Sequence, residues 1–223
     1  MLRYLHARRS FLSRLGIGLT GGAALGAAGV SPVQAQTGEG GRWQPARHPS
    51  DDWFDQIPGQ HRFVFDTISA DGVTLALTFI NNYLNASDSG YGLKDKDHAV
   101  VLVLRHRSTP FAFDNAIWGK HGVAITQRTQ YNDPTTKQPA VRNIFLDGPD
   151  ISVKAMQARG VVFWQCNVAL GVVAQQLAAA TQMPMEDVRA DLVAGLNPGV
   201  RLMPSHVMAL ALAQEHGFTY MKP

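Results

Sequence analysis

The chain has one cysteine in 223 residues, Cys166. A single thiol cannot form an intramolecular disulfide, and it cannot supply the cysteine cluster of a structural zinc site. Four of the histidines are candidate metal ligands by residue type: His98, His106, His121 and His206. They show neither H-x-H nor H-E-x-x-H spacing, so we expect no metal.

Signatures of nucleotide cofactors and of common hydrolases are also lacking. No G-x-G-x-x-G follows the first expected strand, and there is no Walker sequence and no G-x-S-x-G elbow. We therefore expect no cofactor.

Acidic residues are absent from the first 35 positions, which hold four arginines. A basic start is followed by an apolar, glycine-rich stretch over 15–30 and by small residues ending at Ala35. This order is typical of a secretory signal, and Arg8-Arg9-Ser10-Phe11-Leu12 resembles a twin-arginine export motif. The apolar run of 16 residues is shorter than the roughly 20 that a spanning helix needs. We expect cleavage after Ala35 and a periplasmic protein that meets the membrane only through this signal; an uncleaved signal anchor is the alternative.

The net charge of +3 includes the arginines of residues 1–35, which cleavage would remove. Taking four arginines from the 20 basic residues leaves 16 against 17 acidic ones, a net charge of −1. This balance gives no electrostatic reason for a nucleic-acid partner. Residues 36–58 lack periodicity and predict a linker whose aromatic side chains, among them Trp53 and Phe54, dock on the domain or on a partner subunit. The folded domain is expected over 59–223.

Apolar runs and helical periodicities alternate along that domain. The segment 98–104 (HAVVLVL) is apolar without alternation, as in a strand buried on both faces of a parallel sheet. Alternating elements of this kind predict a single-domain α/β three-layer sandwich with a mostly parallel sheet of about five strands. The expected strands are 61–68, 98–104, 161–166, 192–194 and 218–221, with a further one near 143–146; the expected helices are 73–84, with Asp71 as its cap, 111–120, 152–159, 168–180, 184–189 and 204–216. Residues 122–149 are expected to form a long surface excursion.

Cys166 closes an expected strand, and a helix begins at Asn167. Ligand sites of open α/β sheets lie at this carboxyl edge, and the N–H groups at a helix start favour an anion. Cys166 is therefore a candidate nucleophile. Free cysteines are also among the most buried residues, so simple packing is the alternative.

The second candidate cluster follows the strand 98–104. Arg105 and His106 are expected at the same edge as the thiol, where they would stabilise a thiolate or hold an anionic sulfur compound. His206, near the start of the last helix, could point to the same rim. The alternative is a solvated strand end with no ligand.

Several short motifs in the second half of the chain resemble the DsrE/DsrF-like family. They are Cys166-Asn167 after an apolar strand, Leu196-Asn197-Pro198-Gly199-Val200, Met203-Pro204-Ser205-His206-Val207 and Gln214-Glu215-His216-Gly217-Phe218-Thr219-Tyr220. The resemblance covers about residues 60–223. It implies a compact α/β protein that forms trimers or hexamers and carries sulfur on Cys166.

From this resemblance we expect a sulfur-carrier or thiol-relay protein with Cys166 as the catalytic residue. Arg105, His106, Asn167 and His206 are its expected ligand-binding neighbours, and a sulfur-donor or acceptor protein or a small sulfur compound is its expected partner. The alternative is a non-catalytic oligomeric module that binds a small ligand, with Cys166 as buried packing.

Overall fold

The structure is a computed structural model that describes residues 49–223. The expected export signal, its cleavage site and most of the expected linker lie outside these residues. Within the described part of the chain, no helix is long and apolar enough to cross a membrane.

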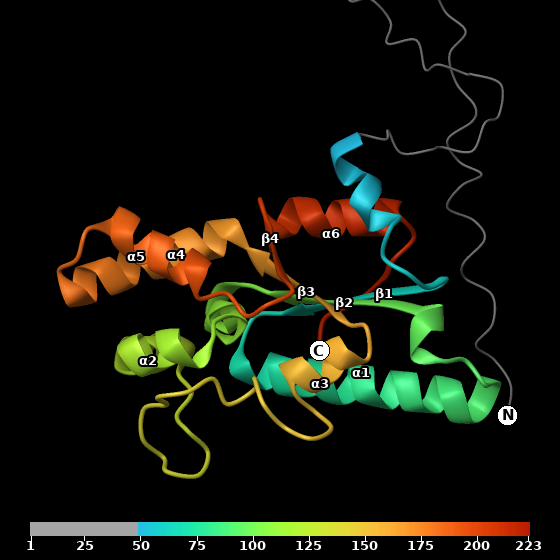
Figure 1. Cartoon of the computed structure of the whole chain (residues 1–223), viewed down its shortest axis with the longest axis horizontal. Helices are drawn as coiled ribbons and strands as arrows, with labels where there is room; N and C mark the ends of the chain where they lie inside the picture. Colours follow the sequence, from blue (N-terminus) through green and yellow to red (C-terminus); the bar gives the residue numbers. More distant parts are fainter. Residues whose placement is uncertain (1–48) are drawn as a thin grey trace, which may run out of the picture. The chain divides into compact units, whose positions relative to one another are not determined.

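A five-stranded, fully parallel sheet forms the centre of the domain (Figure 1). Its strand order is β4-β3-β2-β1-β5, and every neighbouring pair is parallel. The strands are β1 (His61–Thr67), β2 (His98–Leu104), β3 (Val162–Cys166), β4 (Val200–Met203) and β5 (Thr219–Met221). All seven residues of the central β2 are buried, which explains its continuous apolar sequence.

Helices cover both faces of the sheet, so the α/β three-layer architecture expected from the sequence is confirmed (Figure 1). The α-helices are α1 (Ala70–Tyr91), α2 (Asn115–Thr129), α3 (Val153–Ala158), α4 (Asn167–Thr181), α5 (Met185–Ala194) and α6 (His206–Glu215); 3-10 helices are η2 (Pro49–Phe54), η3 (Asp95–Asp97) and η4 (His106–Ala112). The larger apolar cluster joins helices α1 to α5 to one face. A smaller cluster joins α6 and η2 to the other face.

Three helix predictions differ from the structure at their ends. α1 is longer than expected, and its N-cap is Ser69 rather than Asp71, because the Ser69 hydroxyl accepts the Gly72 N–H at 3.1 Å. The helix expected over 111–120 is instead α2, which begins after the Asp114 cap and continues to Thr129. The short helix expected over 184–189 continues to Ala194 as α5.

The strand expected over 192–194 was wrong, because these residues form the last turn of α5 and Leu192 is buried against the helical core. The strand not expected from the sequence is β4, whose four residues are too short a run, interrupted by Arg201, to be recognised. The strand considered near 143–146 was also wrong, because this stretch is a turn closed by the hydrogen bond from Leu146 N to Asn143 O.

The excursion expected over 122–149 is shorter than predicted, and most of its residues after α2 are exposed, as expected. Its first eight residues belong to α2, and the rest contacts that helix through hydrogen bonds from Ala140 N to Thr126 Oγ1 and from Asn143 N to Asn115 Oδ1. The Asn143 side chain is buried and donates to the carbonyl oxygens of Phe111 and Phe113 at 2.9 and 2.8 Å. The burial of Asn143 is possible because its side-chain amide satisfies these two backbone acceptors.

The connections after β3 and β4 leave the sheet in opposite directions. β3 continues into α4 on the face of the larger cluster, whereas β4 leads to α6 on the other face. Adjacent parallel strands with diverging connections open a crevice at their carboxyl ends. Cys166 and Met203 are paired at this position of the sheet, so the thiol lies where the fold favours a site.

Candidate functional site

Cys166 ends β3 and caps α4. Its Sγ accepts the N–H of Ala169 at 3.4 Å, so the sulfur replaces the hydroxyl or carboxylate oxygen usually found at an N-cap. The residue is 2% exposed. The helix N-terminus therefore faces the sulfur with an N–H group, which favours negative charge on that atom.

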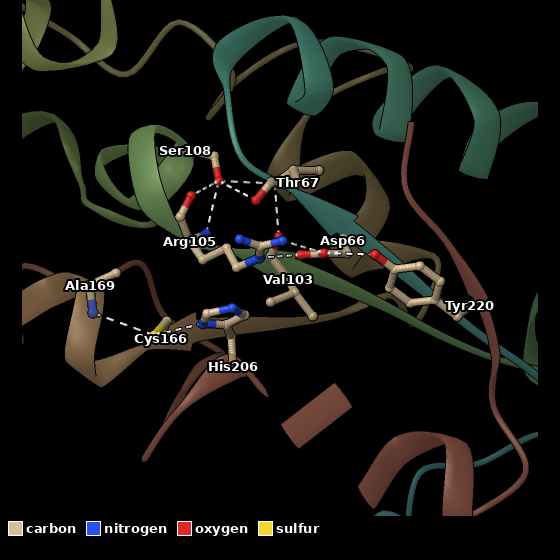
Figure 2. Close-up of polar contacts among 9 residues, drawn as sticks. All are labelled: Asp66, Thr67, Val103, Arg105, Ser108, Cys166, Ala169, His206 and Tyr220. Atoms are coloured by element: carbon tan, nitrogen blue, oxygen red, sulfur yellow. Dashed lines mark hydrogen bonds and ion pairs between the residues drawn. The ribbon is translucent and has the colours of Figure 1, made fainter. Parts of the chain in front are cut away.

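His206 lies beside the thiol from the first turn of α6. Its Nδ1 is 3.5 Å from Cys166 Sγ, and the imidazole is half-buried (Figure 2). Burial lowers the pKa of His206, and the positive charge of Arg105 lowers it further. The imidazole is thus neutral near pH 7 and has the capacity to accept a proton.

Arg105 follows the end of β2 and forms a two-point ion pair with Asp66 of β1. Arg105 Nε and Nη2 donate to the two carboxylate oxygens, each at 2.7 Å. The Asp66 side chain is fully buried, and that of Arg105 is 20% exposed. The hydrogen bond to Asp66 raises the pKa of Arg105, so the guanidinium stays charged beside the thiol and the imidazole.

Tyr220 extends this network from the edge strand β5. Its hydroxyl donates to Asp66 Oδ2 at 3.0 Å, and Figure 2 shows Tyr220, Asp66 and Arg105 in a row. Burial, followed by the hydrogen bond to Asp66, raises the pKa of Tyr220. Asp66 therefore accepts from two side chains, one that follows β2 and one in β5.

The backbone beside Arg105 is held by a second set of hydrogen bonds. Arg105 N donates to the buried Ser108 hydroxyl at 2.9 Å, and Ser108 Oγ lies 2.9 Å from the Thr67 carbonyl oxygen. Thr67 in turn donates through Oγ1 to Val103 O at 2.8 Å. These contacts join the carboxyl ends of β1 and β2 and restrict the position of the guanidinium.

The two remaining predicted site residues take part in other contacts. His106 is exposed, has a φ of 57°, and uses its carbonyl oxygen to accept from Arg128 Nη2 at 3.0 Å. Asn167 accepts from Arg189 Nη2 at 2.7 Å, a bond that joins α4 to α5. The described contacts therefore bring Arg105 and His206 to the thiol region, but not the side chains of His106 and Asn167.

Asp66 and Tyr220 were missed in the sequence. Asp66 had a usable signal, because a carboxylate near the end of the apolar strand HRFVFDT needs a buried partner. Tyr220 gave none, because its role depends on the pairing of β5 with β1 across 154 residues of sequence.

The side chains of this site are suited to thiol chemistry. The Cys166 sulfur has an imidazole nitrogen on one side, a helix N-terminus on another and a guanidinium held by an ion pair nearby. Among residues 49–223 there is no group of three or more His, Cys, Asp or Glu side chains that could hold a metal ion.

Comparisons with known proteins assign this chain to no family. No family model matches the chain, and no curated protein matches it. A solved structure of a protein of unknown function from Methanobacterium thermoautotrophicum is similar, with a TM-score of 0.42 and 15% sequence identity over 74% of this chain and 100% of that one. This similarity carries no information about activity.

Proposed function

We propose that this protein is a sulfur carrier whose Cys166 accepts a sulfur atom and passes it on. The observation that carries the proposal is the contact between Cys166 Sγ and His206 Nδ1 at 3.5 Å. A thiol beside a neutral imidazole is the arrangement by which proteins activate cysteine.

His206 acts first, as the proton acceptor. Because burial lowers the pKa of His206, its imidazole is unprotonated near pH 7 and takes the proton from the Cys166 thiol. The Ala169 N–H and the Arg105 guanidinium then stabilise the thiolate. Asp66 acts through Arg105 as a positioning residue.

The transfer itself is an exchange between sulfur atoms. The Cys166 thiolate attacks the outer sulfur of a persulfide donor; a new S–S bond forms on Cys166, the donor S–S bond breaks, and the donor leaves as a thiolate. The proton held by His206 is available to that leaving thiolate. An acceptor thiolate reverses these steps and takes the sulfur from Cys166, so no outside oxidant or reductant is required.

The test is the mass of the full-length protein after incubation with a small-molecule persulfide. We expect a gain of one sulfur atom that is lost in Cys166→Ser, since the chain has no other cysteine. His206→Gln should slow sulfur uptake near neutral pH by about a hundredfold. His61→Gln is a matched control, because His61 is exposed at the opposite end of β1. Equal sulfur uptake by the wild type and Cys166→Ser would overturn the proposal.

A non-catalytic binding module is the second candidate, and the 2% exposure of Cys166 favours it. In that case the thiol only packs in the core. Alkylation of the native protein separates the two: reaction in the folded state supports the carrier, whereas reaction only after denaturation supports the binding module.

Family, compartment and assembly belong to the same proposal. We propose a DsrE/DsrF-like protein that is exported to the periplasm through Arg8-Arg9 and assembles as a trimer or hexamer. Cell fractionation of the wild type and of Arg8→Lys/Arg9→Lys tests export. Light scattering tests assembly, and a monomer mass would contradict it.

A further inference from the structure

A cavity lies between α2 and α4, away from the thiol site. Its volume is about 250 Å³, and its apolar lining comes from Ile125, Val173, Leu177 and two alanines, Ala124 and Ala180. Pockets for drug-sized ligands measure roughly 300–1,000 Å³, so this cavity suits a smaller molecule.

Arg128 supplies the positive charge of this cavity. The side chain is half-buried; Nη2 donates to His106 O at 3.0 Å, and Nη1 donates to Gln176 Oε1. Both acceptors are neutral. Its Nε is buried without a hydrogen-bond partner, which leaves the guanidinium incompletely satisfied.

Arg107 adds a second positive charge close to the first, because it directly follows His106, whose carbonyl oxygen accepts from Arg128 Nη2. Burial, and after it the charge of Arg107, lowers the pKa of Arg128. Within residues 49–223 neither arginine forms an ion pair with a carboxylate. Two neighbouring cations beside an apolar cavity, with no acid to balance them, are complementary to an anion.

We propose that this cavity binds a small amphiphilic carboxylate. Its apolar chain packs against the accessible side chains of Ala124 and Ala180, and its carboxylate faces the guanidinium group of Arg128, with the exposed Arg107 as a second cation beyond the lining. The ligand must carry both an apolar chain and a negative charge. A small anion without a chain makes no contact with the apolar lining, and an apolar cation is repelled by the two arginines.

This site is independent of the proposed sulfur carrier. None of its lining residues belongs to the Cys166 cluster. The thiol cluster lies beside the first turn of α6, whereas the cavity lies between helices of the opposite face of the sheet. Failure of one proposal therefore leaves the other intact.

The test is a titration of the isotopically labelled full-length protein with hexanoate, followed by NMR amide shifts. We expect shifts confined to residues 124–128 and 173–180, with the neighbouring 106–107. Acetate, which lacks the chain, and hexylammonium, which reverses the charge, should leave these signals in place.

Four variants complete the test. Arg128→Gln should weaken hexanoate binding about tenfold or more and Arg107→Gln less, because the second arginine is exposed. Ala180→Trp should block the cavity. Lys154→Gln, which removes one positive charge from α3, should bind like the wild type.

Absence of hexanoate shifts in the folded protein, equal shifts with hexylammonium, or hexanoate affinity unchanged in both arginine variants would overturn the proposal.

Discussion

At the scale of single residues, Asp66 connects most of the polar groups of the thiol site. It is fully buried and accepts from Arg105 at two atoms and from Tyr220 at one. A buried carboxylate is costly unless every oxygen is paired, and here three donors meet this need. The main effect of the Asp66–Arg105 ion pair is to hold the guanidinium beside the thiol. Its net contribution to the free energy of unfolding is small.

We predict that Asp66→Ala lowers the free energy of unfolding by about 3–5 kcal/mol, because it leaves the partly buried Arg105 without its partner. The double variant Asp66→Leu/Arg105→Met should lose less, because neither charge remains. Urea denaturation measures both. The exposed pair of Asp88 and Lys94 is the control, and Asp88→Ala should cost under about 1 kcal/mol. A double variant as unstable as Asp66→Ala would contradict this account.

At the scale of elements, the 3-10 helix η2 completes the core on the α6 face. Phe54 is fully buried, stacks on His216 with ring centroids 4.8 Å apart, and meets Trp164 of β3 edge-on at 5.3 Å. The neighbouring Trp53 contacts the same Trp164 at 5.4 Å. Part of the expected linker is therefore packed against the sheet, as the aromatic residues of this segment indicated.

We predict that Phe54→Ala destabilises the domain by about 3–5 kcal/mol, the cost of removing a buried aromatic side chain. Phe79→Ala is the matched control. Phe79 lies on α1 with 39% of its surface exposed, so its loss should cost roughly 1 kcal/mol. The midpoint of urea denaturation measures both, and equal losses would mean that η2 does not contribute to the core.

At the scale of the whole molecule, buried histidines link stability to pH. Burial lowers the pKa of His98, His121 and His206. In the unfolded chain these groups titrate near pH 6.5, so around that pH the unfolded state binds more protons than the folded one. Stability therefore rises with pH through this range and is lost on acidification.

We predict that the free energy of unfolding falls between about pH 7.5 and about pH 5.5. Denaturant titrations at a series of pH values measure the fall, and His206→Gln should reduce its size. A flat or rising curve on acidification would contradict the prediction. Below about pH 4, protonation of Asp95 and Asp191 should continue the loss, because hydrogen bonds from Arg159 and Lys120 lower their pKa values.

Local patterns were sufficient for much of the fold. The strands β1, β2 and β3 are close to their predicted bounds because each contains apolar residues that are buried in the sheet, continuously so in β2. β4 was missed because this edge strand has only four residues, one of them an arginine, and only Met203 is buried. The last turn of α5 was mistaken for a strand because three apolar residues have no period of their own.

The amino-acid order alone places Cys166 between a strand and a helix and Arg105 after the neighbouring strand, because both positions depend on local order along the chain. The partners of the two side chains depend on the packing of distant segments. Asp66, His206 and Tyr220 come from other strands and helices, and the order of the strands brings them together at one edge of the sheet. The single cysteine excludes a disulfide scaffold, and in the folded protein its Sγ lies beside His206 Nδ1 and the Ala169 N–H.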